Sequence, residues 1–297
     1  MRRSTSRSQK APRMDARPTK EAVLPLERAV VPPVSKFGRA VQDFRESAEL
    51  YPLWMHQGRA EVLRRYRRTV LGPLWHTLSL GIFIAVTGVI WSSIMKADLH
   101  RYMLFLPSGL IVWGMISAYV VDGTAILTGA QQQALSSRMP YPMLAMALVW
   151  RLFLIFLHQL PLCVIFGVLF GGRLDANTLL LIPGTLLAAA NGVWMSLLAG
   201  LITLKFRDAQ SAIASFMHIL MFATPVFWSR DLLIGQKIAW LVDANPLYHL
   251  VEIMRQPLLG EQPTSVDWLV STLMLAVGLV LTVFVYGRVR HRIAYWY

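Results

Sequence analysis

One run of 25 residues, Leu71–Met95, contains no Asp, Glu, Lys or Arg. About 20 apolar residues that rise 1.5 Å each cross the roughly 30 Å hydrocarbon core of a bilayer, so this run is long enough to span a membrane as a helix. Five arginines lie directly before it, from Arg59 to Arg68. Because charged side chains are costly to bury in lipid, these arginines must stay outside the bilayer. The junction therefore indicates an integral membrane protein.

Similar charge-free runs recur along the chain and predict six spanning helices. The runs are Leu71–Met95, Tyr102–Val121, Leu152–Gly172, Ala176–Leu204, Ala209–Ser229 and Trp268–Gly287. Strands of a transmembrane β-barrel would instead be about ten residues long and would alternate in hydrophobicity. The composition agrees, since 55% of the residues are hydrophobic and only 15% are charged. We predict an all-α, polytopic membrane protein.

The segment between the last two predicted spans contains a further, partly apolar piece at residues 238–259. It is interrupted by Pro246 and Pro257 and carries Asp243, Glu252 and Arg255. Prolines interrupt helices and charges are expensive in lipid, so this piece is a poor spanning helix. We predict a pair of short re-entrant or interfacial helices here.

Basic residues are unevenly distributed, which predicts an orientation. Residues 1–70 hold 16 Lys and Arg against 7 Asp and Glu. With the amino terminus in the cytoplasm, 22 basic residues lie on the cytoplasmic side and six on the other, with Arg151 left over inside a span. Both termini are therefore predicted to be cytoplasmic. The net charge of +13 is explained by anchoring and orientation, without a nucleic-acid partner.

These patterns divide the chain into four parts. They are a basic, disordered cytoplasmic arm at 1–44, an amphipathic helix at 45–70, a six-span domain at 71–290 and a cytoplasmic tail at 291–297. Small residues at Gly192, Ser196 and Gly200, four apart, predict a close approach between the fourth span and another helix.

Sites for catalysis, metals or cofactors are not indicated. Cys163 is the only cysteine and lies in an apolar run, which excludes an intrachain disulfide and a multi-cysteine metal site. The seven histidines show neither HxxxH nor HExxH spacing, and no nucleophile-elbow pattern occurs. We expect no catalytic residues, no bound metal and no cofactor.

Four blocks of sequence together resemble the membrane subunit of ABC-type polysaccharide exporters, the permeases for O-antigen, capsule or teichoic acid chains. The blocks are RRYRRTVLGPLW (64–75), SRMPYPMLAMALVWR (137–151), KFRDAQSAIASFMHILMFATPVFW (205–228) and NPLYHLVEIMRQPLLG (245–260). The resemblance covers roughly residues 45–290 and includes the order and the spacing of all four blocks. It implies a homodimer in the bacterial inner membrane, with a channel for lipid-linked polysaccharide between the subunits and two separate ATPase subunits as partners.

The chain has no GxxxxGK[ST] loop, so ATP hydrolysis is expected from the partner. By the resemblance, the helix at 50–68 and the loop at 131–141 contact that ATPase. The residues expected at this interface are Arg59, Arg64, Arg65, Arg68, Gln132, Ser136 and Arg138. A helix with an apolar stripe of Leu53, Trp54, Val62, Leu63, Tyr66 and Val70 fits this role. A purely lipid-anchoring basic helix is the alternative.

Aromatic side chains near the spans are candidates for the channel wall, because a glycan presents hydroxyls and apolar sugar faces that flat rings can contact. The candidate set is Trp91, Trp113, Tyr119, Trp194, Phe216, Phe222, Phe227 and Trp228. For any single member, contact with lipid or with a neighbouring helix is the alternative role.

Asp122 and Arg151 are the charges that cost most to bury, at about 2.5–3.5 kcal/mol each at mid-membrane. Asp122 lies late in the second span and Arg151 lies early in the third span. A helical hairpin formed by these two spans would bring the two side chains close together. We predict a structural ion pair, with a channel-lining role as the alternative. A pair of this kind predicts that Asp122→Asn alone is damaging and that a doubly neutral variant recovers.

Three other functions compete with polysaccharide export. An ABC exporter of drugs or lipids would share the six-span plan. A membrane-embedded enzyme that modifies glycans or lipids should show clustered acidic or histidine residues at one membrane face, and the sequence has none. A scaffold that transports nothing would lack a neighbouring ATPase gene.

Overall fold

The computed structural model describes residues 35–66, 74–131, 139–172 and 175–296, and these residues form helices and connecting turns, with no strand among them. The α-helices are α1 (Lys36–Glu49), α2 (Tyr51–Tyr66), α3 (Leu74–Met95), α4 (Leu99–Val121), α5 (Ile126–Gly129), α7 (Pro142–Phe170), α8 (Leu181–Lys205), α9 (Ala209–Ala223), α10 (Ala239–Asp243), α11 (Pro246–Leu258), α12 (Ser265–Val289) and α13 (Ile293–Trp296). Short 3₁₀ helices are η1 (Asp122–Ala125), η2 (Ala176–Leu180), η3 (Arg230–Leu233) and η4 (Arg290–Arg292). The predicted all-α class is confirmed.

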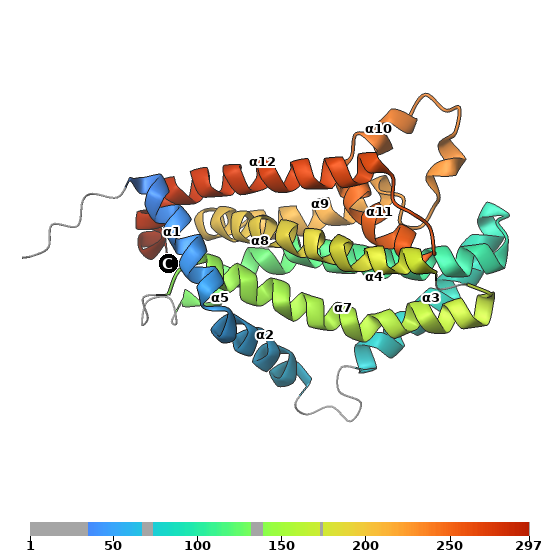
Figure 1. Ribbon diagram of the computed structural model, residues 1–297, viewed down its shortest axis with the longest axis horizontal. Coiled ribbons are helices and arrows are strands. Elements are labelled where there is room, and N and C mark those ends of the chain that lie inside the picture. Colours follow the sequence, from blue (N-terminus) through green and yellow to red (C-terminus); the bar gives the residue numbers. More distant parts are fainter. Residues whose placement is uncertain (1–34, 67–73, 132–138, 173–174, 297) are drawn as a thin grey trace, which may run out of the picture. The chain divides into compact units, whose positions relative to one another are not determined.

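Five helical segments are long and apolar enough to cross a membrane. They are Leu74–Met95, Leu99–Gly129, Pro142–Phe170, Ala176–Lys205 and Ser265–Trp296. Helices α4, α7, α8 and α12 run along the length of the bundle, whereas α3 is inclined to them (Figure 1). The remaining predicted span, Ala209–Ser229, is the 15-residue helix α9, about 23 Å long. It ends at Ala223 because Thr224 precedes Pro225 and adopts the extended backbone that a following proline favours.

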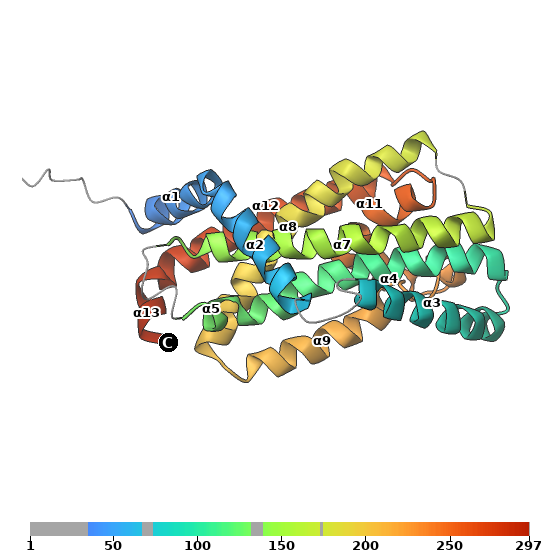
Figure 2. The same cartoon turned by 90° about the horizontal axis from the view of Figure 1, so that it is seen from below.

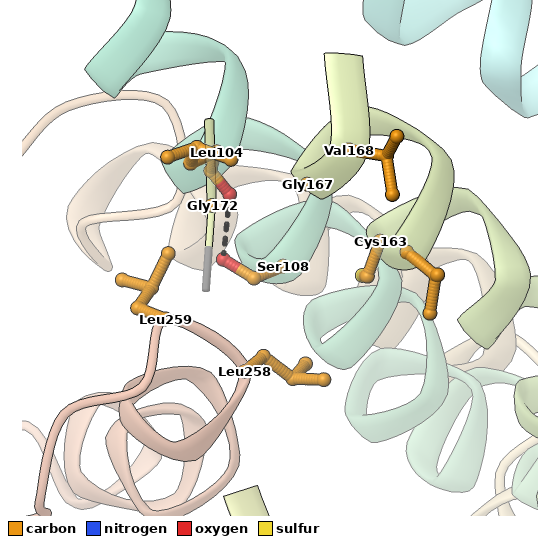
Figure 3. A pocket seen from close by; sticks show the side chains of 9 residues that line it. Leu104, Ser108, Cys163, Gly167, Val168, Gly172, Leu258 and Leu259 are labelled. Carbon is orange, nitrogen blue, oxygen red and sulfur yellow. Dashed lines mark hydrogen bonds between the residues drawn. The ribbon is translucent and has the colours of Figure 1, made fainter. Parts of the chain in front are cut away.

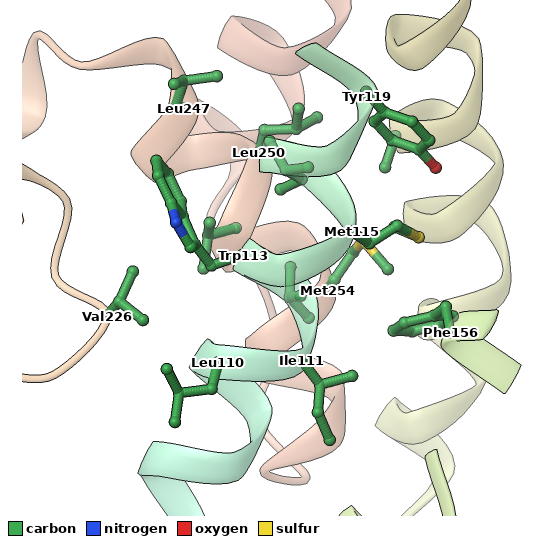
Figure 4. Close-up of a cluster of buried hydrophobic side chains, with 14 of the residues drawn as sticks. Leu110, Ile111, Trp113, Met115, Tyr119, Phe156, Val226, Leu247, Leu250 and Met254 are labelled. Atoms are coloured by element: carbon green, nitrogen blue, oxygen red, sulfur yellow. The ribbon is translucent and has the colours of Figure 1, made fainter. Parts of the chain in front are cut away.

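Helix α4 lies at the centre of the bundle and packs against α3, α7, α8, α9 and α11. Most of its side chains are buried, and Figure 4 shows Trp113, Met115 and Tyr119 surrounded by side chains from neighbouring elements. Leu250 of α11 and Phe156 of α7 are among these buried neighbours. By contrast, α3 and α12 expose many large apolar side chains, as expected for helices that face lipid.

Small residues allow α8 to approach the α4–η1 segment closely, as the spacing of Gly192, Ser196 and Gly200 predicts. A Cβ atom on Gly192 would lie 2.8 Å from the ring of Tyr119, and one on Gly123 would lie 2.7 Å from the Cα of Ser196. A larger side chain at either position would therefore force the two segments apart. The packing role assigned to this spacing is confirmed.

Helices α1 and α13 lie at the same end of the bundle (Figures 1 and 2), which we call the α1 end. Buried Asp43 of α1 binds α12 and η4: its carboxylate accepts from the Tyr286 hydroxyl at 2.5 Å and from Nη2 of Arg290 at 2.8 Å. Short helices α10 and α11 lie in the predicted segment before α12, at the opposite end, which we call the α11 end. Helix α11 packs against α4, α8 and α12.

Two expectations for the amino-terminal region require correction. Residues 36–44 were assigned to a disordered arm, but they form the first half of α1, because Ser35 caps the helix at the Gly38 amide (3.0 Å) and the α1 face with Ala40 and Asp43 is buried. The single helix expected at 45–70 is also divided at Leu50, since Pro52 offers no N–H to continue α1. Residues 1–34 lie outside the described part.

Candidate functional site

Helix α2 is held closely against α7 at the α1 end. A Cβ atom on Gly58 would lie 2.7 Å from the carbonyl oxygen of Ala147, so only glycine permits this approach. The ring of Trp54 meets that of Trp150 edge to face, with centroids 6.2 Å apart, and Val62 is buried. Trp54 and Val62 therefore occupy the buried face as predicted.

The other residues of the predicted apolar stripe do not lie on the buried face of α2 or are not described. Leu53 and Leu63 are exposed, because the face that meets α7 passes through Gly58 and Glu61. Val70 lies outside the described residues, as does Arg68. The buried face of α2 is thus narrower and more polar than the sequence pattern predicted.

An ion cluster joins three elements next to this contact. Arg151 of α7 donates to Glu61 of α2 at 2.6 Å and to Asp122 of η1 at 2.7 Å. The Arg151 side chain is 12% exposed, while those of Asp122 and Glu61 are 36% and 43% exposed. The structure therefore brings Asp122 and Arg151 together and adds Glu61. One signal could have found Glu61, since it is the single acidic residue among residues 50–70.

A cavity of about 560 Å³ opens beside the cluster. It is lined by Gln57, Glu61, Arg64, Arg65, Asp122, Arg151 and Gln210 together with apolar residues of α5 and α7. Arg59, Arg64 and Arg65 are exposed on α2. Gln132, Ser136 and Arg138 lie outside the described residues, so the loop at 131–141 that was expected to contact the ATPase is described only at its two ends. The α1 end thus combines a docked helix, exposed arginines and a polar cavity.

Four of the aromatic candidates form one cluster between α3 and the segment that follows α9. The Phe227 ring lies 6.0 Å from that of Trp91 and 5.8 Å from that of Phe222. The Trp228 indole N–H donates to the carbonyl oxygen of Phe222 at 3.1 Å. Phe222 is exposed, whereas Phe227 is buried. The cluster therefore presents only part of its aromatic surface to the outside of the subunit.

The other four candidates are separate from one another. Trp113 and Tyr119 are buried in the subunit core. The indole N–H of Trp194 donates to the side-chain oxygen of Asn191 at 2.9 Å. The Trp194 ring packs directly against Gly278 of α12, where a Cβ atom would collide with it. Phe216 is exposed on α9. In this conformation, the members of the candidate set with accessible surface are Phe216 and Phe222, which are exposed, and Trp91, Trp194 and Trp228, which are half-buried.

Buried charges gather on α11 at the opposite end. Arg255 pairs with Glu252, donates to the carbonyl oxygen of Pro225, and lies over the Phe105 ring at 4.4 Å. Both charged side chains are only 3% exposed. In the sequence, these charges indicated that the segment does not span the membrane. In the structure, Arg255 connects α11 to α4 through Phe105 and to the segment after α9 through Pro225.

His249 forms a second buried polar contact at the α11 end. Its Nδ1 lies 2.6 Å from a carboxylate oxygen of Asp267, and its Nε2 lies 2.8 Å from the carbonyl oxygen of Asp243. Both partners are acceptors, and only a protonated imidazolium can donate to both. Asp267 also accepts from Thr264 in the capping box that begins α12. The imidazolium therefore links α10, α11 and α12.

We expect this link to weaken as the pH rises. The hydrogen bond to Asp267 raises the pKa of His249 above its ordinary value of 6.5, and the Asp243 carbonyl acts in the same direction against the effect of burial. Because the pKa of His249 is higher in the folded than in the unfolded protein, its protonation contributes its full stabilisation below the unfolded pKa of 6.5. This stabilisation is lost as the pH rises through the higher pKa of the folded state. Melting curves between pH 5.5 and 8.5 should show the advantage of the wild type over His249→Gln shrinking with pH. A constant difference would contradict the assignment.

A smaller cavity of about 60 Å³ lies between α4, α7 and the end of α11 (Figure 3). Its walls include Leu104, Cys163 and Leu258, and the Ser108 hydroxyl donates to backbone carbonyl oxygens of its own helix, at 2.7 Å to Phe105 and at 3.4 Å to Leu104. A space of this size holds about two water molecules, so Cys163 lies in the wall of a packing gap rather than in a ligand site.

Comparison with known proteins agrees with this architecture. The family model described as ABC-2 type transporter matches residues 54–259, which run from Trp54 in α2 to the end of α11. Two proteins of Klebsiella pneumoniae, each named O-antigen export system permease protein RfbA, are 22% and 21% identical, and each match covers 77% of this chain and 89% of the relative. A protein of the same name from Myxococcus xanthus is 23% identical over 64% of this chain and 74% of its own length. The resemblance noted in the sequence is confirmed, and the chain belongs to the ABC-2 type transporter family.

Proposed function

We propose that this chain is the permease subunit of an ATP-driven exporter that moves a lipid-linked polysaccharide across the bacterial cytoplasmic membrane. The observation that carries the proposal is the match to three relatives named as O-antigen export permeases, two of them over 89% of their length. The described bundle of long apolar helices supports a transport role. We further propose that two copies of the chain form one transporter, with the path for the glycan between them, as the family resemblance in the sequence implies.

The ATPase subunit is proposed to dock at the α1 end, which faces the cytoplasm in this proposal. Helix α2 is fixed on α7 through Gly58, while Arg59, Arg64 and Arg65 on its other faces remain exposed. A helix fixed on one side and charged on the other can pass a partner's movement to the bundle. Arg68, Gln132, Ser136 and Arg138 are proposed to extend this surface. Both termini lie in the cytoplasm in this arrangement, which agrees with the excess of basic residues in cytoplasmic segments.

The second copy of the chain is proposed to face α9. In α9 only Met217 is buried, and the helix exposes Phe216, Ile219 and Phe222. An apolar helix with so little packing in its own subunit is expected to meet either lipid or another protein surface. Phe216 and Phe222 are the channel-lining candidates that this arrangement favours.

Deletion of the gene tests the proposed function. Surface polysaccharide should be lost, and lipid-linked chains should accumulate on the inner face of the cytoplasmic membrane. The matched control restores the wild-type gene from a plasmid. Normal surface polysaccharide without accumulation inside would contradict the proposed cargo and would favour export of a drug or a lipid.

A further inference from the structure

A cavity of about 800 Å³ lies at the α11 end. Its walls come from the turn between α3 and α4, from the first turns of α4, from η3 and from one face of α11. This volume falls within the roughly 300–1,000 Å³ range of small-molecule sites. The cavity is distinct from the polar cavity beside Arg151, which lies at the other end of the bundle.

Carboxylates and guanidinium groups both line this cavity. Four carboxylates come from Asp98, Asp231, Glu252 and Glu261, and three guanidinium groups come from Arg101, Arg230 and Arg255, of which Arg230 is paired with Asp243 and Arg255 with Glu252. A site for phosphate would show an excess of cations, and the described residues hold no group of side chains placed to bind one metal ion. Mixed donors and acceptors suit an uncharged ligand that carries many hydroxyl groups.

Part of the wall is rigid and polar. Arg255 is fixed by Glu252, by the carbonyl oxygen of Pro225 and by the face of Phe105. Gln256 donates to Glu252 at 2.8 Å, which orients its amide. Groups that are already held in place lose little conformational entropy when they bind a ligand.

An aromatic ring completes the lining. Tyr248 lines the cavity, is half-buried, and lies next to His249, with ring centroids 5.2 Å apart. A sugar ring has an apolar face that packs on an aromatic ring and hydroxyls that bind carboxylates, amides and guanidinium groups. We propose that this cavity is a saccharide subsite that holds a short segment of the exported glycan. The proposal rests on the proposed function and adds a place where each subunit contacts its cargo.

Photocrosslinking in cells that make the polysaccharide tests the subsite. A benzoylphenylalanine replaces Leu232, an exposed residue of η3 that lines the cavity, and the control position is Val266, an exposed residue at the start of α12 outside the lining. After irradiation, glycan attached to the purified full-length chain is measured. We expect attachment at position 232 to exceed that at 266 by at least fivefold.

A second set of variants tests the aromatic contact. In the chain with the probe at 232, Tyr248→Ala should lower glycan attachment about fivefold, since loss of one ring contact costs about 1 kcal/mol. Tyr248→Phe keeps the ring and should retain attachment. If Tyr248→Ala does not accumulate, Gln256→Leu replaces it, with an expected loss of similar size.

The outcomes separate the two proposals. Selective attachment at 232 that depends on the Tyr248 ring supports the subsite. Equal attachment at 232 and 266, or attachment that is insensitive to both Tyr248→Ala and Gln256→Leu, overturns the subsite when deletion of the gene still abolishes surface polysaccharide. If surface polysaccharide does not depend on the gene at all, the proposed function fails and the subsite fails with it.

Discussion

Replacement of Gly58 by leucine is expected to abolish export while the chain still inserts into the membrane. A Cβ atom at this position would lie 2.7 Å from the carbonyl oxygen of Ala147 and 3.1 Å from the ring of Trp150. The carbonyl belongs to the backbone of α7 and cannot rotate away, so α2 must move. Overpacking of this kind typically costs about 1–3 kcal/mol. The displacement would also separate Glu61 from Arg151, which are 2.6 Å apart.

Gly167→Leu is the matched control, because Gly167 lies on α7 far from this contact and a Cβ atom there would meet nothing within 4 Å. Surface polysaccharide and the amount of ATPase subunit that copurifies with the chain are the measurements. Gly58→Leu should reduce export at least tenfold, and Gly167→Leu should stay near the wild-type level. Wild-type export by Gly58→Leu would show that the close α2–α7 contact is not needed for coupling.

The features that the sequence predicted are those with a strong local cause. Long charge-free runs demand helices because lipid offers no hydrogen-bond partners to an open backbone, so the all-α class followed directly. Asp122 and Arg151 were expected to meet because isolated charges are costly in a span. The four-residue spacing of Gly192, Ser196 and Gly200 predicted a close helix contact for a geometric reason.

The remaining features depend on partners that are distant in the chain. Asp43 and Tyr286 are 243 positions apart, and the helical pattern of α1 does not reveal that its carboxylate is buried against α12. In the sequence, Glu252 and Arg255 only make the segment of α11 less apolar. That the two side chains form a buried ion pair is visible only in the structure. The aromatic candidates were alike in sequence, and only packing separated buried Trp113 and Tyr119 from exposed Phe216 and Phe222.

The Arg151 cluster leads to a different prediction from the one that a simple pair would give. Arg151 has two carboxylate partners, so Asp122→Asn alone leaves Glu61 in place and should have a small effect. The double variant Glu61→Gln with Asp122→Asn removes both negative charges. It leaves a guanidinium that is 12% exposed and whose Nε, within the part of the chain that the structure describes, is buried without a hydrogen-bond partner.

That double variant is expected to be the least stable of the series. Loss of the partners of a fully buried charge lowers the free energy of unfolding by about 3–5 kcal/mol. Because the cavity beside Arg151 gives its guanidinium some access to solvent, we expect a smaller loss of about 2 kcal/mol here. A chain of this size would then melt about 4–8 °C lower. Addition of Arg151→Met removes the orphaned charge, so the triple variant should recover most of the loss, as measured by thermal melting of the purified protein. If the triple variant melts no higher than the double variant, electrostatic balance is not what holds α2, η1 and α7 together.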